Sequence, residues 1–205
     1  MMKTLSCRLL SFYAFLTLTV VLLGGCAARG VPQNVFDLGT PQPVQHDAGL
    51  PPISVAAPTM PSWLDSVEMA YRLDYANDQQ LRPYTNSRWS MPPVQLFTQR
   101  LKSRLADAGG PVLSYAENAS NVPFTLYIDA DDFTQLFDRP DHSTGRIALR
   151  ISLFNGRKLM AQKSFVAQSD ATGNDAAGGA RALTKASDAM IADILQWLLE
   201  LNLKN

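Results

Sequence analysis

The chain has 205 residues, of which 46% are hydrophobic, and its 18 Lys and Arg balance 18 Asp and Glu. Once a leader is removed, this length suits one domain better than two, and it is sufficient to bury a core. The balanced charge gives no electrostatic reason to expect a nucleic acid as a partner, because nucleic-acid-binding domains are usually strongly basic.

The N-terminus has the pattern of a secretory signal peptide. Lys3 and Arg8 are followed by an apolar run over residues 9–23, then by two glycines and Cys26. A spanning helix needs about 20 predominantly apolar residues, and this run falls short of that length. We therefore predict that residues 1–25 are a cleaved lipoprotein signal peptide. Loss of its two basic residues leaves a mature chain with a formal charge of −2.

Cys26 is the predicted site of membrane attachment. Cys7 lies in the signal peptide, so the mature chain cannot form an internal disulfide even in an oxidising compartment. The stretch Leu23-Gly24-Gly25-Cys26 resembles the bacterial lipobox, whose cysteine receives diacylglycerol and then an N-acyl chain such as palmitate. Two or three acyl chains anchor stably, since each buried methylene contributes about 0.8 kcal/mol. Ala27, in place of aspartate, resembles lipoproteins sorted to the outer membrane.

Residues 26–34 are predicted to be the lipidated N-terminus and a short tether, followed by a single domain over residues 35–205. Val35 lies nine positions after Cys26, a distance of at most about 30 Å when the chain is fully extended. If the first strand joins the fold, the domain is held close to the bilayer. Alternating apolar residues predict short strands over residues 35–38, 53–56 and 69–75, with a proline-containing loop over 40–52.

An amphipathic helix is predicted next. Ser90 is the expected N-cap, Pro92 and Pro93 fall in the first turn, and Gly109-Gly110 ends the helix. The apolar stripe consists of Val94, Phe97, Leu101 and Leu105.

Arg88 and Trp89 precede this helix and have two interpretations. With Ser90 as the cap, Trp89 and Val94 form the two ends of a hydrophobic staple, and Arg88 joins an ion pair. Alternatively, the pair is a partner-binding hot spot, since Trp and Arg are enriched in such sites.

Two further strands and a hairpin are expected. The alternation of residues 124–130 is out of phase with that of Phe133 and Phe137, which predicts a β-bulge near residues 131–132. Asn155-Gly156 predicts a hairpin after a strand over residues 147–153. We prefer a three-residue loop, which pairs Leu153 with Leu159 and Ile147 with Phe165 and keeps the apolar residues on one face.

The C-terminal segment predicts a long amphipathic helix, with Asn174 or Asp175 as its N-cap. Its stripe consists of Leu183, Met190, Ile191, Ile194, Leu195, Leu198 and Leu201. The chain as a whole is therefore predicted to be an α+β domain, in which a mostly antiparallel sheet packs with two principal helices.

We find no strong catalytic or metal motif. Gly173 and Gly178-Gly179 have the spacing of a phosphate loop, but Ala180 occupies the position where a lysine is needed, so we interpret them as a flexible loop that enters a helix. His142 lies beside Asp138 and Asp141, which could suggest a metal site or a hydrolase. Of the other aspartates nearby, Asp129 and Asp131 share one strand face whereas Asp132 points to the other, and residues 140–145 have the pattern of a hairpin turn. The ligands therefore do not converge, and we expect no metal, no other cofactor and no enzyme.

The sequence resembles a known family, the auxiliary lipoproteins of ABC-type transport systems, which includes the PqiC-like lipoproteins. The resemblance rests on the lipobox, on "FDLG" from Phe36, and above all on "YRLDYANDQQLRPYTNSRWSMPPVQLFTQRLKSRL" over residues 71–105. In that family a Ser-Arg-Trp element precedes a helix with Arg-Leu pairs, here Arg100-Leu101 and Arg104-Leu105. Phe36 stands where a tyrosine is common.

The resemblance implies a non-enzymatic lipoprotein of the outer membrane that faces the periplasm. Its implied partners are an ABC permease, an ATPase and a protein with a mammalian-cell-entry (MCE) domain, which together move lipids or other hydrophobic molecules, and its implied role is docking. Self-association into homo-oligomers is compatible with this role, and no nucleic acid is expected. The alternatives are a periplasmic lipid-binding shuttle or receptor and, less favoured, an envelope hydrolase.

Overall fold

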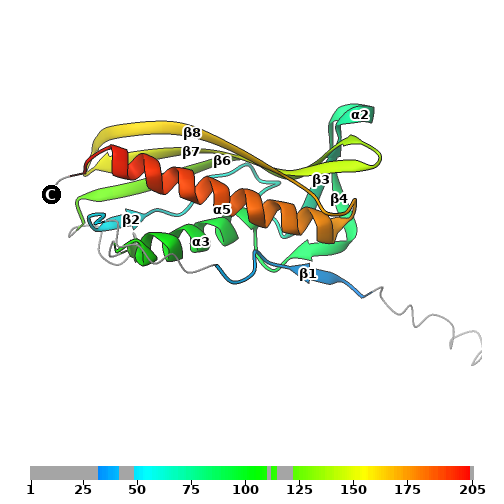
Figure 1. Ribbon diagram of the computed structural model, residues 1–205, viewed down its shortest axis with the longest axis horizontal. Coiled ribbons are helices and arrows are strands. Elements are labelled where there is room, and N and C mark those ends of the chain that lie inside the picture. The colour runs from blue at the N-terminus through cyan, green and yellow to red at the C-terminus, as the bar shows by residue number, and fades with distance from the viewer. Residues whose placement is uncertain (1–31, 42–48, 110–111, 115–121, 204–205) are drawn as a thin grey trace, which may run out of the picture. The chain divides into compact units, whose positions relative to one another are not determined.

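The computed structural model describes residues 32–41, 49–109, 112–114 and 122–203, and residues 33–205 form one compact unit. The predicted signal peptide and Cys26 lie outside the described residues. An eight-stranded mixed sheet and two long helices make up this unit (Figure 1). None of the described helices is long and apolar enough to cross a membrane.

Three long strands pair antiparallel in the order β6 (Phe124–Arg139), β7 (His142–Asn155) and β8 (Lys158–Asp170), and β8 forms one edge of the sheet. The β6–β7 register shifts between Ala130 and Asp132, so the predicted β-bulge is confirmed. The bulge lets Phe133 face the core although it is out of phase with Ile128.

Two separate groups of strands lie along the other edge of β6. At the start of β6, β2 (Ile53–Val55) pairs with it in parallel, and β5 (Val112–Ser114) pairs with β2. At the far end, β3 (Glu68–Leu73) pairs with β6 in parallel. Beyond β3 lie β4 (Asp78–Trp89), which is antiparallel to it, and β1 (Asn34–Phe36), which is parallel to β4; the short helix α2 (Asp74–Asn77) joins β3 to β4.

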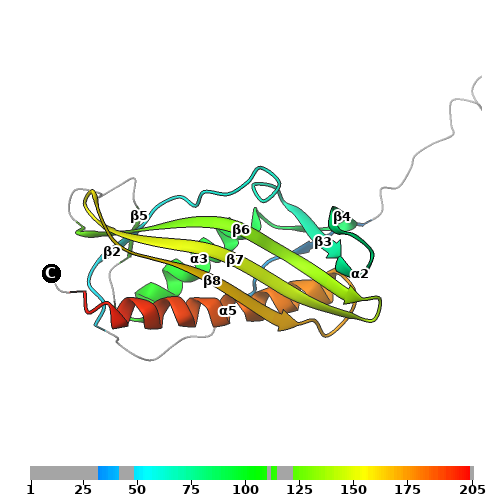
Figure 2. The ribbon, with the colours of Figure 1, turned by 90° about the horizontal axis from the view of Figure 1, so that it is seen from above.

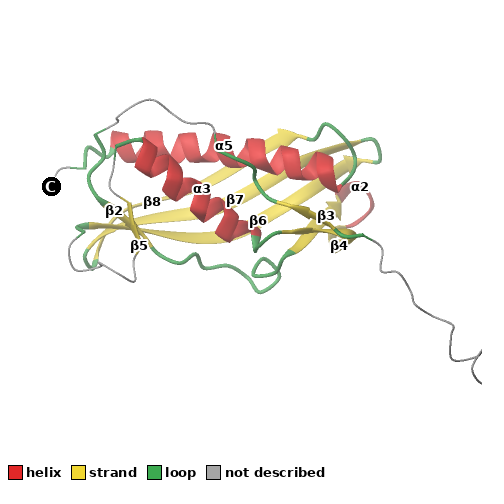
Figure 3. Ribbon diagram, turned by 90° about the horizontal axis from the view of Figure 1, so that it is seen from below, coloured by secondary structure: helices red, strands yellow, loops and turns green. Residues whose placement is uncertain are grey.

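Both principal helices, α3 (Pro93–Asp107) and α5 (Ala176–Glu200), cover the same face of the sheet. Figure 3 shows the helices in front of the strands, and Figure 2, from the opposite side, shows the strands in front. The α+β prediction with two principal helices is confirmed. The fully buried core includes Phe97, Leu101, Leu126, Ile128, Phe133, Ile147, Leu149, Ile151, Leu183, Ile191 and Ile194.

Of the two predicted helix N-caps, the one of α5 is confirmed and the one of α3 is wrong. Asp175 accepts a hydrogen bond from the Gly178 N–H at 2.7 Å, so one of the two residues proposed as the cap of α5 is confirmed. The Ser90 cap is wrong, because α3 begins at Pro93 with Pro92 in the N-cap position and no side-chain cap. The Ser90 N–H donates instead to the Phe36 carbonyl at 2.7 Å, which continues the pairing of β1 with β4.

The predicted three-residue hairpin loop is also wrong. Asn155 pairs with Lys158, so the turn has two residues, Gly156 and Arg157, and Gly156 has a φ of 57°. A register shift then places Leu153 opposite Ala161 and Leu149 opposite Phe165. From Ala161 onward this register moves the pairing by two residues from the predicted one, so those side chains keep their predicted face. Leu159, which was predicted to face the core with Leu153, instead lies opposite Phe154 and is exposed.

The glycines near the start of α5 allow the helix to approach the sheet closely. Gly178 and Gly179 lie inside the first turn of α5 and are buried, so they do not form the flexible loop that we predicted. A Cβ atom on Gly179 would lie 2.0 Å from Gln135 Oε1, and one on Gly145 would lie 2.6 Å from the Leu183 backbone nitrogen. The absent side chains therefore set the distance between α5 and strands β6 and β7.

We predict that Gly145→Ala lowers the free energy of unfolding by about 1–3 kcal/mol, because the helix backbone opposite it must shift. Gly173→Ala is the matched control, since its added Cβ would meet no atom closer than 3.5 Å. Chemical denaturation measures both, and equal stabilities of the two variants would contradict the close approach.

Candidate functional site

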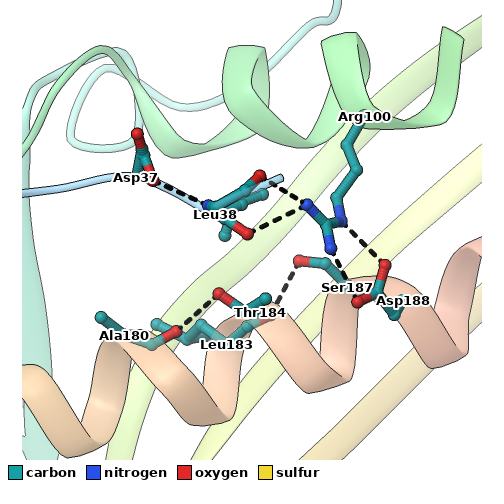
Figure 4. Close-up of polar contacts among 9 residues, drawn as sticks. Asp37, Leu38, Arg100, Ala180, Leu183, Thr184, Ser187 and Asp188 are labelled. Atoms are coloured by element: carbon teal, nitrogen blue, oxygen red, sulfur yellow. Dashed lines mark hydrogen bonds and ion pairs between the residues drawn. The ribbon is translucent and has the colours of Figure 1, made fainter. Parts of the chain in front are cut away.

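The segment that follows β1 is held between the two principal helices by Arg100. The guanidinium donates to both Asp188 carboxylate oxygens at 2.8 Å, and its Nη1 donates to the carbonyls of Leu38 and Gly39 at 2.9 Å (Figure 4). Arg100 comes from α3 and Asp188 from α5. We call Asp37, Leu38, Gly39, Arg100 and Asp188 the N-terminal clamp.

The backbone of residues 37–39 forms a tight turn that suits the hydrogen bonds with Arg100. The Gly39 N–H donates to Asp37 Oδ1 at 2.7 Å, and Gly39 has a φ of 66°, a conformation that favours glycine. Leu38 is buried in the core, and the turn directs both carbonyls toward Arg100. The stretch "FDLG" thus supplies two backbone carbonyls that accept hydrogen bonds from the guanidinium.

The charged guanidinium of Arg100 is buried, and burying a charge costs free energy unless the charge is paired. Only 5% of Arg100 is exposed, and a buried cation is tolerated when its hydrogen-bond donors are satisfied and an opposite charge lies close by. The fork of Arg100 meets the carboxylate bidentately, which a lysine cannot reproduce. Replacing Arg100 leaves the Asp188 carboxylate without these two donors, and replacing Asp188 leaves two N–H groups of the guanidinium without this acceptor.

From the sequence, Arg100 stands out only as part of an Arg-Leu pair, and the clamp is not predicted. A signal was present, since Arg100 lies three residues after Phe97 and directly before Leu101, both on the buried stripe of α3. A cation at the edge of such a stripe requires a partner. Nothing in the sequence identified Asp188, which is 88 residues away.

The side chains of Arg88 and Trp89 lie on opposite faces of β4, as those of neighbouring residues in a strand do. Trp89 is 1% exposed and packs edge-on against Phe133, with ring centroids 5.8 Å apart. Arg88 is exposed and lies opposite Val35 of β1. A partner could therefore reach Arg88 directly but not the Trp89 indole, and binding through Arg88 stays a prediction.

His142 belongs to a surface cluster at the β6–β7 turn. Its Nδ1 lies 2.6 Å from Asp138 Oδ1, and its Nε2 lies 3.8 Å from Asp170 at the end of β8. The hydrogen bond with His142 lowers the pKa of Asp138 below its ordinary value. No group of three or more potential metal ligands occurs within the described ranges. The contacts of His142 join the ends of three strands.

Side chains fill the interface between α5 and the sheet, where Leu149, Ile151, Leu183 and Ile194 are fully buried. The largest groove among those described, about 560 Å³, lies elsewhere, between α3 and the segment around residues 57–65. Polar and charged side chains, including Gln95, Gln99 and Lys102, contribute to its lining.

Comparisons with known proteins bear on the family and on the fold. Residues 36–195 match the family model of the ABC-type transport auxiliary lipoprotein component. Protein XCC0632 from Xanthomonas campestris, assigned to DUF330, is 18% identical with a TM-score of 0.67, over 83% of this chain and 94% of that one. A second solved structure, of an uncharacterized protein, is 14% identical with a TM-score of 0.64, over 82% and 99% of the two chains. At these identities the two solved structures show a shared fold alone, and no curated protein matches the sequence.

We predict that Arg100→Met and Asp188→Leu each destabilise the domain by about 2–4 kcal/mol, whereas the double variant loses clearly less than the sum. A double-mutant cycle by chemical denaturation measures this coupling. Hydrogen exchange should also increase around residues 37–40 in Arg100→Met. Additive losses would show that the two side chains do not act together.

We predict that His142→Ala leaves partner binding unchanged and lowers stability only slightly near neutral pH. Because the folded-state pKa of Asp138 is lowered, the stabilisation that its hydrogen bond provides is present above the unfolded pKa. It is lost as the pH falls through the folded value. The difference in stability between wild type and variant should therefore vanish in acid, as measured by denaturation at several pH values. A loss of activity in cells with normal folding would indicate a chemical role instead.

Proposed function

This chain belongs to the family of ABC-type transport auxiliary lipoprotein components, and from this premise we propose that it is a non-enzymatic docking protein at the outer membrane. In this proposal Cys26 carries the lipid anchor, the domain faces the periplasm, and its partner is the MCE-domain component of a system that moves lipids or other hydrophobic molecules. The domain fixes the end of that periplasmic component beside the membrane.

The N-terminal clamp is the observation that carries this proposal. Seven residues lie between Cys26 and Asn34, so the tether reaches at most about 30 Å. β1 then pairs with β4, and Arg100 fixes the backbone at Leu38 and Gly39. The chain next to the tether is therefore held by a strand pairing and a buried ion pair, as a protein that must keep a partner near a membrane requires.

The geometry gives the alternatives less support. A lipid-binding shuttle needs an apolar cavity of lipid size, whereas side chains fill the described interface between α5 and the sheet. A hydrolase needs a nucleophile beside a base, and the described neighbours of His142 are aspartates at an exposed turn. No described observation favours either alternative over docking.

We predict that Cys26→Ala abolishes function in cells without unfolding the domain, because residues 33–205 contain the whole described core. Membrane fractionation, thermal unfolding and complementation of a deletion strain measure the three parts of this prediction. The matched control is Cys7→Ala, which changes the other cysteine and should behave as wild type. Normal function of the unlipidated chain would rule out a role that depends on anchoring.

A further inference from the structure

Apolar side chains gather on the helix-free face of the sheet near the β7–β8 turn. Leu159 and Met160 are 49% and 46% exposed, and Tyr127 is 37% exposed. Phe154 pairs with Leu159 across the two strands and packs edge-on against Tyr127, with ring centroids 5.2 Å apart. Leu126 and Leu153, the strand neighbours of Tyr127 and Phe154, face the core, so this aromatic pair points away from the helices.

The same hairpin is strongly basic. Residues 143–169 contain five cations and no carboxylate, although the mature chain as a whole is predicted to be slightly acidic. Arg146 pairs with Asp132, and Arg150 lies opposite Asp129 in the strand register. Arg157 and Lys158 are exposed and form no ion pair with any residue that the structure describes. We call Tyr127, Phe154, Arg157, Lys158, Leu159 and Met160 the hairpin patch.

The hairpin patch lies at the opposite end of the sheet from β1 (Figure 1). Asn155 pairs with Phe124 at the start of β6, whereas β3, which connects to β4 and β1, pairs with β6 from Gln135 onward. At about 3.3 Å per residue, these two positions on β6 are roughly 36 Å apart. Because the tether joins the chain at β1, the patch can extend away from the anchoring membrane while β1 stays close to it.

We propose that the hairpin patch docks onto the periplasmic transport component, at an apolar surface bordered by Asp and Glu side chains. This proposal rests on the proposed docking function and names its surface. Exposed aromatic and aliphatic side chains supply the apolar centre of an interface. The two cations beside them select an acidic border and speed association. The position far from β1 favours a protein over the anchoring bilayer as the occupant.

Two double variants test the patch in the chain produced without residues 1–26, which retains the compact unit. Arg157→Glu with Lys158→Glu reverses the charge, and Leu159→Ser with Met160→Ser removes apolar surface. The matched controls are Lys102→Glu with Lys185→Glu on the helices and Val35→Ser on β1, where Val35 is 53% exposed. Surface plasmon resonance measures binding to the purified periplasmic domain of the MCE component, and thermal unfolding checks folding.

We expect each patch variant to weaken binding at least about tenfold, while the controls bind as wild type. The charge-reversed variant should also lose most of the salt dependence of the association rate. Binding of the patch variants at the wild-type level would overturn the proposal while leaving the docking function intact. Failure of the wild-type chain to bind would instead overturn the proposed function on which it rests.

A second measurement tests whether the hairpin patch binds a lipid bilayer. The same chain is mixed with vesicles of phosphatidylglycerol and phosphatidylethanolamine and sedimented. We expect no sedimentation beyond that of the charge-reversed variant. Sedimentation that requires Arg157 and Lys158, together with unchanged binding of the patch variants to the MCE component, would assign the patch to a lipid surface and overturn the proposal.

Discussion

The buried guanidinium of Arg100 is the constraint on which the arrangement of the two helices depends. Its fork must meet Asp188 on α5 and two carbonyls after β1 at the same time, all at 2.8–2.9 Å. Three segments that are far apart in the sequence are thereby fixed relative to one another. Apolar packing between α3, α5 and the sheet supplies most of the stability, but it is non-directional, whereas the ion pair requires one geometry.

The clamp also links the fold to the proposed anchoring. A lipidated chain transmits any force between membrane and partner through the residues that follow Cys26. The chain is held by the domain first at β1, which pairs with β4, and then at the clamp. The long strands β6 and β7 continue from there to the hairpin patch at the other end. One end of the sheet is thus suited to attachment and the other to recognition.

Much of the fold could be predicted from the sequence, because alternation and helical periodicity depend on local residues alone. The phase change between Ile128 and Phe133 predicted the bulge, and Asp175 was one of two candidate caps for α5. The hairpin register could not be predicted, because beyond Met160 a three-residue loop and a two-residue turn with a bulge place the same side chains on the same face, and they differ only next to the turn, at Leu159. The observed register sets Phe165 opposite Leu149, where its ring meets Trp197 of α5, and only the tertiary packing decides between the two.

The candidate site was harder to predict than the fold. The clamp needs Asp188, 88 residues from Arg100, and no local pattern connects them. Arg88 and Trp89 were predicted together because they are adjacent, yet a strand directs them to opposite sides. The parallel pairing of β2 and β3 with β6 was not predicted either, because alternation shows which face is buried but not which strand is the neighbour.

The proposed docking role requires the lipidated domain to be part of an ABC-type transport system with an MCE component. Affinity purification of the full-length lipoprotein from gently solubilised envelopes, followed by mass spectrometry, tests it most directly. We expect the MCE protein, the permease and the ATPase to be recovered with the lipoprotein and to be absent from a matched purification of an unrelated outer-membrane lipoprotein. Recovery of the folded, lipidated protein without any of the three would contradict it.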